Sequence, residues 1–238
     1  MRLFLILINF SLIFLPLQSE QITPNTLSNA KTNTPFEISK IIYTSNIDNI
    51  KTELTAPQLG ADSNLEHLYL LDPSFSVIEK NNRNKTVRAS IGYFNRMHNL
   101  IEFEENVQIR ISSNTKNVLL DADKLIMNNH DDVVTSPLDS YFQANNFHIS
   151  SKKLTIKDFT KQQNKIIFED GRIINPDTNE KLGSANKINY SLDSGILIMK
   201  GLAVIKDKNI SVHADEIHYN PESKKIIKSI NSKIINNS

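Results

Sequence analysis

The chain has 238 residues, enough for one large domain, and carries 27 Lys and Arg residues against 26 Asp and Glu residues. Because the two charge signs are balanced and interspersed, the sequence lacks the basic patch that a nucleic-acid-binding protein needs. The absence of cysteine excludes thiol catalysis, cysteine-ligated zinc and disulfide bonds, so hydrogen-bonded sheet and an apolar core must hold the fold.

The first residues form an apolar segment. Residues 3–17 are largely apolar, and these 15 residues fall short of the roughly 20 that cross a bilayer as a helix. The segment is typical of a secretory signal, so residues 1–19 predict export, with Ser19 as a small residue at the cleavage position. Leu17 fits poorly two positions earlier, so an uncleaved membrane anchor stays open as the alternative. The polar, aperiodic residues 20–34 predict a flexible lead-in.

Short alternating runs make up the rest of the chain. They are rich in Ile, Val, Leu, Phe and Tyr and are separated by clusters of Asn, Asp, Gly, Pro and Ser, a pattern typical of antiparallel sheet. Residues 60–71 are the one weak helix candidate. We therefore predict an all-β domain over residues 35–231, followed by a tail at 232–238.

A repeat runs through these strands. Four segments share one order of apolar, small and charged residues: NVLLDADKLIM (117–127), NFHISSKKLTI (146–156), EKLGSANKINY (180–190) and NISVHADEIHY (209–219), with a fainter copy KTVRASIGY (85–93). With Arg88, Ala122, Ser151, Ala185 and Ala214 as anchors, the spacing alternates between 34 and 29 residues. Such alternation indicates a tandem array of hairpins, and chance alignment of similar strands is the alternative.

The apolar residues of each unit change parity halfway along. Val118, Leu120 and Ala122 share one parity, whereas Leu125 and Met127 share the other. A regular strand would place the two sets on opposite faces, but one extra residue, a β-bulge, returns both to the same face. Each unit is therefore predicted to be a bulged or bent strand with one apolar face.

Turn signals lie between the units. FEENVQI (103–109), FEDGRII (168–174) and MKGLAVI (199–205) predict hairpin returns in which Asn106, Gly171 and Gly201 can take a positive φ. Further turns are expected at 175–180, 192–195 and 220–223, where Asn, Pro, Asp and Ser cluster.

These motifs resemble a known family. ISVHADEIHYNPESKKI (210–226) is similar to the Ile-x-Ala-Asp-x-Leu-x-Tyr repeat of the OstA-like domain shared by LptA, LptC and LptD, and FEENVQI keeps the Asn-Val of that family's Gly-Asn-Val turn. TPFEISKIIY (34–43) resembles the first strand of LptA. Residues 72–174 resemble LptC, and residues 181–230 resemble LptA. Because Glu105 and Leu202 depart from the turn motif and the first segment resembles an LptA signal, the choice between the LptA and LptC roles stays open.

The resemblance implies a bent, open β-jellyroll of stacked antiparallel strands whose inner face shelters lipid acyl chains. It further implies a periplasmic protein, exported or anchored in the inner membrane, that binds lipopolysaccharide through its lipid A acyl chains and passes it along the Lpt bridge to the outer membrane. Other Lpt components would join end to end by β-augmentation. A large apolar face normally marks a binding surface. The residues predicted to line it fill matching positions of successive units: Val118, Leu120, Phe147, Ile149, Ile188, Tyr190, Ile210 and Val212.

The sequence predicts neither catalysis nor a bound metal or cofactor. His213 and His218 lack a third ligand at a suitable spacing, and Asp123 and Asp215 fill equivalent places on different strands instead of converging. No phosphate-binding loop, dinucleotide fingerprint or nucleophile motif is present in the sequence. The alternative to a lipid carrier is a structural or adhesive exported β-solenoid without a lipid ligand, although the large apolar side chains of these units fit a solenoid poorly.

Overall fold

A computed structural model describes residues 36–47, 50–62, 64, 66–79, 84–112, 117–144, 146–161, 164–207 and 209–236. Within these ranges the chain is all-β, in 18 strands of one antiparallel sheet, which confirms the predicted fold class. The helix expected at 60–71 is wrong, because strands occupy both ends of that stretch. The predicted signal at 1–19 and lead-in at 20–34 lie outside the described residues.

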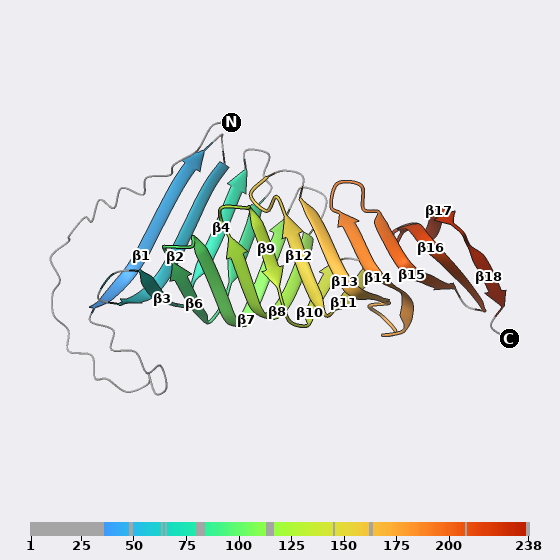
Figure 1. Cartoon of the computed structure of the whole chain (residues 1–238), viewed down its shortest axis with the longest axis horizontal. Helices are drawn as coiled ribbons and strands as arrows, with labels where there is room; N and C mark the ends of the chain where they lie inside the picture. Colours follow the sequence, from blue (N-terminus) through green and yellow to red (C-terminus); the bar gives the residue numbers. More distant parts are fainter. Residues whose placement is uncertain are drawn as a thin grey trace. The chain divides into compact units, whose positions relative to one another are not determined.

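All of the described strands belong to one compact unit, Asn33–Ser238. In Figure 1 they extend from β1 and β2 at one end to β17 and β18 at the other. Their bounds are β1 (Phe36–Ile47), β2 (Ile50–Ala61), β3 (His67–Leu71), β4 (Ser74–Glu79), β5 (Asn84–Arg88), β6 (Ile91–Asn95), β7 (Leu100–Ser112), β8 (Asn117–Asn128), β9 (Val133–Ser136), β10 (Ser140–Ala144), β11 (Phe147–Ser151), β12 (Lys153–Lys157), β13 (Lys165–Ile174), β14 (Lys181–Ser191), β15 (Leu197–Asp207), β16 (Ile210–Asn220), β17 (Lys225–Ile230) and β18 (Lys233–Asn236).

Long strands are shared between two layers of this sheet. One half of β7 pairs with β5 and the other with β6, and β8 divides in the same way between β10 and β9. Layer A contains the short strands β4, β5, β10, β11 and β18, and layer B contains β3, β6, β9, β12 and β17. The long strands β2, β7, β8, β13, β14, β15 and β16 cross from one layer to the other, which is the bent jellyroll that the sequence predicts.

In alternate long strands, residues with a positive φ lie at the point where the strand crosses from one layer to the other. Glu105 and Asn106 in β7 have φ values of 60° and 54°, and Gly201 and Leu202 in β15 have values of 72° and 49°. The strand register shifts beside them, between Glu104 and Val107 in β7 and between Lys200 and Ala203 in β15. These residues turn the strand from one layer into the next without ending it.

The hairpin returns predicted at 103–109, 168–174 and 199–205 are wrong, because all three segments lie inside long strands. The positive φ expected at Asn106 and Gly201 is confirmed. In the second segment Asp170, not Gly171, has the positive φ of 52°. Glycine is required at position 171 for lack of space, since a Cβ there would lie 2.7 Å from Cδ1 of Ile188. The turns predicted at 175–180, 192–195 and 220–223 are confirmed, with the last turn one residue further along.

Small side chains mark the row of positions where the long strands cross, which we call the fold line. The small residues along it are all buried: Ala89, Ala122, Ser140, Ser151, Ala185, Ala203 and Ala214. The hydroxyl groups of Ser140 and Ser151 hydrogen-bond each other at 2.8 Å. Four predicted anchors of the repeat thus occupy equivalent places, but the fifth, Arg88, is exposed, and its buried neighbour Ala89 is the true equivalent.

The predicted change of parity is confirmed in β8. Val118, Leu120, Ala122, Leu125 and Met127 are all buried, although they alternate with opposite parity on the two sides of the fold line. The units at 117–127, 180–190 and 209–219 are single bent strands. The units at 85–93 and 146–156 break at the fold line into two short strands each. The predicted tail at 232–238 contains β18, which pairs with the first half of β16.

Candidate functional site

A continuous apolar interior lies between the two layers. Its buried residues come from strands β4 through β16 and from both layers. Near its middle, the ring of Phe142 in layer A lies 5.3 Å from Phe168 and 5.4 Å from Tyr190 in layer B, measured between centroids. Burial, and to a lesser degree the charge of Glu222, raises the pKa of Tyr190 to about 12.

The structure brings seven of the eight residues predicted to bind lipid into or against this interior. Six are buried in it: Val118, Leu120, Phe147, Ile149, Ile188 and Tyr190. Val212 is half-buried and packs against them, whereas Ile210, the first residue of β16, is 45% exposed. The Phe147 and Tyr190 rings meet across the two layers at 5.5 Å.

The predicted set is incomplete, because it draws mostly on the first half of each unit. The second halves contribute equally buried residues, among them Leu154 and Ile156 in β12 and Ile217 in β16. The parity change was the signal that could have found them, since it places both halves of a unit on one face. Phe168 and Phe142 lie outside the repeat units and were missed altogether.

The inner face becomes exposed at the C-terminal end of the array. Val212 in β16 pairs with Ile234 in β18, so both side chains lie on the same face of layer A, and Ile234 is 68% exposed. Almost every residue of β17 and β18 is exposed. The apolar interior is thus open to solvent where the described strands end.

Both ends of the array present strand edges with no pairing among the described residues. At one end β1 pairs along one side with β2, and at the other end β17 and β18 each pair along one side with β16. Three exposed lysines, Lys225, Lys228 and Lys233, lie on these last two strands. Strand β16 is covered on both sides, so at this end only β17 and β18 leave an edge open among the described strands.

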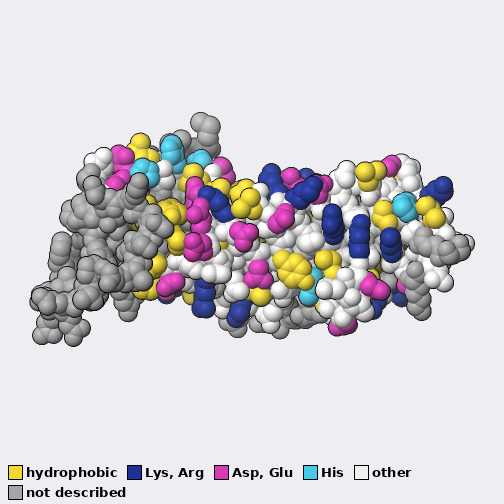
Figure 2. Space-filling view, turned by 90° about the horizontal axis from the view of Figure 1, so that it is seen from below, with side chains coloured by type: hydrophobic (Ala, Val, Ile, Leu, Met, Phe, Trp, Pro, Cys, Tyr) yellow, Lys and Arg dark blue, Asp and Glu magenta, His cyan; other side chains and the backbone are white. Residues whose placement is uncertain are grey.

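The outer surface is polar and of mixed charge. Figure 2 shows Lys and Arg side chains interspersed with Asp and Glu side chains on one face. Ion pairs join neighbouring strands, such as Lys124 with Glu104 at 2.7 Å and Lys200 with Glu216 at 2.8 Å. Lys200, and then His218, lowers the pKa of Glu216 to about 2.

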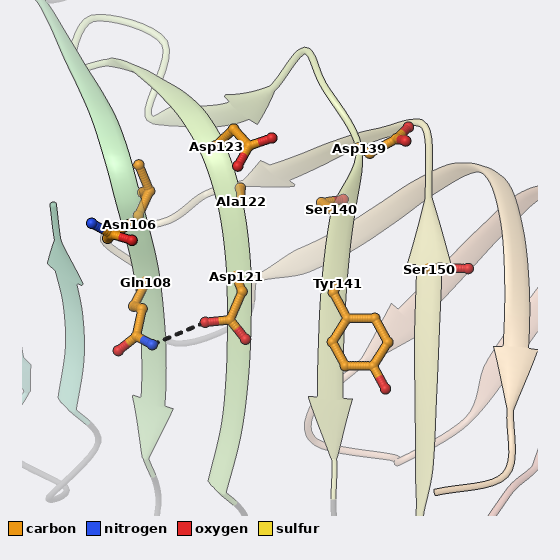
Figure 3. Close-up of a pocket in the computed structure, with 10 residues that line it drawn as sticks. Asn106, Gln108, Asp121, Ala122, Asp123, Asp139, Ser140, Tyr141 and Ser150 are labelled. Carbon is orange, nitrogen blue, oxygen red and sulfur yellow. Dashed lines mark hydrogen bonds between the residues drawn. The ribbon is translucent and has the colours of Figure 1, made fainter. Parts of the chain in front are cut away.

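A shallow depression on this outer surface has a volume of about 500 Å³. Figure 3 shows its polar side chains rising from adjacent strands, with Gln108 donating to Asp121 at 3.0 Å. Asp121 also accepts a hydrogen bond from Gln143, so its carboxylate is occupied on both oxygens.

In the described part of the chain no three His, Cys, Asp or Glu side chains gather to hold a metal ion. Nor does any helix there have the length and apolar character to cross a bilayer.

The sequence model of one protein family matches the chain over residues 3–164, and its description reads lipopolysaccharide-assembly, LptC-related. The match covers more than half of the 238 residues and ends just before β13, whereas β13 to β18 continue the same two layers. No curated protein matches the chain. With its bent strands, two layers and apolar interior, this chain belongs to the LptC-related family of lipopolysaccharide-assembly proteins.

Proposed function

We propose that the chain binds lipopolysaccharide between layers A and B and passes it along a periplasmic bridge of Lpt components. As a member of the LptC-related family it has a role in lipopolysaccharide transport. The observation that carries the finer proposal is the continuous apolar interior, which runs from β4 to β16 and opens at the C-terminal end. A lipid A molecule would place its acyl chains there and keep its sugar headgroup at the surface.

The energetics favour acyl chains as the occupant. Each methylene group that leaves water contributes about 0.8 kcal/mol, so a long acyl chain can replace the contacts that the two layers lose when they separate. The hydrogen bonds of the sheet run within each layer and remain intact during this separation. The lipid would then pass between the apolar interior of this chain and similar interiors in the neighbouring Lpt components.

Photo-crosslinking tests the binding proposal with a pair of adjacent positions. Phe147 is buried in the interior, whereas the next residue, His148, contacts Tyr141 on the outer face of layer A. A photoreactive amino acid at Phe147 should form an adduct with lipopolysaccharide in cells, and the same residue at His148 should not. Adducts at His148 alone would mean that the outer face carries the lipid.

The open strand edges support end-to-end association with other Lpt components. A strand of a neighbour can pair with β1 or with β17 and β18, and the lysines of the C-terminal edge would keep it soluble until it pairs. Deleting the chain from Asn220 onward should abolish association with another Lpt component in a pull-down while the circular dichroism spectrum stays that of a β-protein. Removal of residues 237–238, beyond β18, is the matched control. Undiminished association of the longer deletion would place the contact elsewhere.

We further propose export to the periplasm, directed by residues 1–19, which are either cleaved or kept as an inner-membrane anchor. Sequencing the mature N-terminus decides between the two. The competing β-solenoid without a lipid ligand fits less well, because coils of a parallel β-helix would pair in parallel. Every pairing among the described strands is antiparallel.

A further inference from the structure

A buried ion pair interrupts the apolar interior. Lys85 in β5 is 0% exposed and lies on the same face of its strand as Val87, a residue of the apolar core. Its Nζ lies 2.9 Å from Oε1 of Glu79 in β4, which is also buried. Among the largest fully buried side chains of the described residues, Lys85 is the one that carries a charge.

The ammonium group of Lys85 joins the two layers. It donates hydrogen bonds to the backbone oxygens of Phe159 at 2.7 Å and of Lys161 at 2.5 Å, in the turn that follows β12. Lys85 belongs to layer A, whereas this turn, residues 158–161, connects to layer B. Both lie at strand ends far from the fold line, so Lys85 spans the opposite side of the two layers, which we call the open edge.

The turn at 158–161 fills space inside this open edge. The Phe159 side chain is 1% exposed and belongs to the apolar core, and the Lys85 Nζ lies 5.8 Å from the centroid of its ring. On the layer B side Asp132 holds the turn, because its carboxylate accepts from the Thr160 amide at 2.8 Å and from the Thr160 hydroxyl at 2.9 Å. One layer thus anchors the turn through Asp132, and the other through Lys85.

The polar groups at the open edge are incompletely satisfied. Oε2 of Glu79 and both side-chain polar atoms of Asn164 are buried without a hydrogen-bond partner among the described residues. A buried ion pair stabilises a fold less than well-packed apolar residues of similar size often would, so stability alone does not account for placing a charge here. The charge is explained if the two layers must separate here, because water can replace a polar contact when the layers open.

We propose that the turn at 158–161 is a lid over the open edge, latched by Lys85, and that it leaves the interior when acyl chains go in. Phe159 occupies the place of an acyl chain while no lipid is bound, and the Lys85 ammonium group holds the lid by its two backbone oxygens. Lipid therefore passes between β5 and the end of β12. This inference rests on the proposed function and names the route by which the lipid reaches the interior.

A reversible crosslink tests the lid. The chain has no cysteine, so Asn84→Cys and Lys161→Cys, both at exposed positions, give two unique thiols on opposite sides of the open edge. A flexible bismaleimide with a cleavable disulfide should lock the lid and reduce loading with lipopolysaccharide at least tenfold, and reduction of the linker should restore it. The matched control joins Asn84→Cys to Ser112→Cys, which pair directly within layer A, and should load normally.

The outcomes separate the lid from the proposed function. Normal loading of the locked protein overturns the lid and leaves lipid binding standing, whereas no loading of the unlocked protein overturns lipid binding itself. A second measurement follows the lid directly, through hydrogen exchange of the Phe159 amide, which donates to the Asp132 carbonyl group. Bound lipopolysaccharide should speed its exchange at least tenfold. Unchanged exchange in protein that is loaded with lipid also overturns the proposal.

Discussion

Replacing Lys85 by methionine should destabilise the fold far more than the loss of one surface charge would. Met keeps most of the apolar stem, so the cost arises from the groups left behind: the Glu79 carboxylate, 3% exposed, and the backbone oxygens of Phe159 and Lys161. Removing one partner of a buried pair costs about 3–5 kcal/mol, because water cannot solvate the remaining charge. That is a large part of the roughly 5–15 kcal/mol that keeps a typical domain folded.

The double variant Glu79→Leu, Lys85→Met gives the decisive comparison. It removes both charges and leaves only the two backbone oxygens short of a donor, so we expect it to recover at least about 2 kcal/mol relative to Lys85→Met. Urea denaturation followed by circular dichroism measures all the free energies of unfolding on one scale. A cost below about 1 kcal/mol for Lys85→Met, or strictly additive effects, would refute the buried pair as described.

Three further predictions concern the bends and the surface. Leu202 is 79% exposed at a φ of 49°, so Leu202→Asn should stabilise the fold by about 0.5–1 kcal/mol in the same denaturation assay, and a loss of stability would contradict this. Gly171→Val should cost about 1–3 kcal/mol, because its side chain would collide with Ile188, and an unchanged melting curve would show that the bend can yield. Glu216, whose pKa Lys200 lowers to about 2, should stabilise the fold above the ordinary pKa of 4.5, and this contribution should vanish as the pH falls toward 2. Glu216→Gln should flatten the acid limb of stability against pH over that window, and an identical acid limb would refute the assignment.

The sequence predicted the bent strands because their cause is local. The parity change between Ala122 and Leu125 lies within one strand, and the period of 2 is enough to detect it. The division into two layers was harder to foresee, because it depends on which short strand pairs with each half of a long one. The break of the 85–93 unit at Ala89, which misled the choice of Arg88 as an anchor, belongs to that non-local part.

The latch shows the same limit at the level of single residues. Strand alternation places Lys85 beside Val87, and Glu79 beside Val77, so the inward direction of both could be read from the period. The hydrogen-bond acceptors of Lys85 could not be read from the period, since the backbone oxygen of Phe159 lies 74 positions away in the sequence. A lysine in a polar stretch is ordinarily a solvated residue, and only tertiary pairing makes this one internal.

The two long sides of the layered array are held by different forces, and this difference suits it to carry lipid. At the fold line the backbone itself joins layer A to layer B, because each long strand crosses there. The strand pairs with its neighbour both before and after the register shift. At the open edge the layers meet through side chains, chiefly apolar ones, with Lys85 as a polar link. Separation about the fold line therefore breaks no strand pairing, and the apolar contacts that it costs are of the kind that acyl chains replace. A latch has an effect only where the layers can part, which is the side on which Lys85 lies.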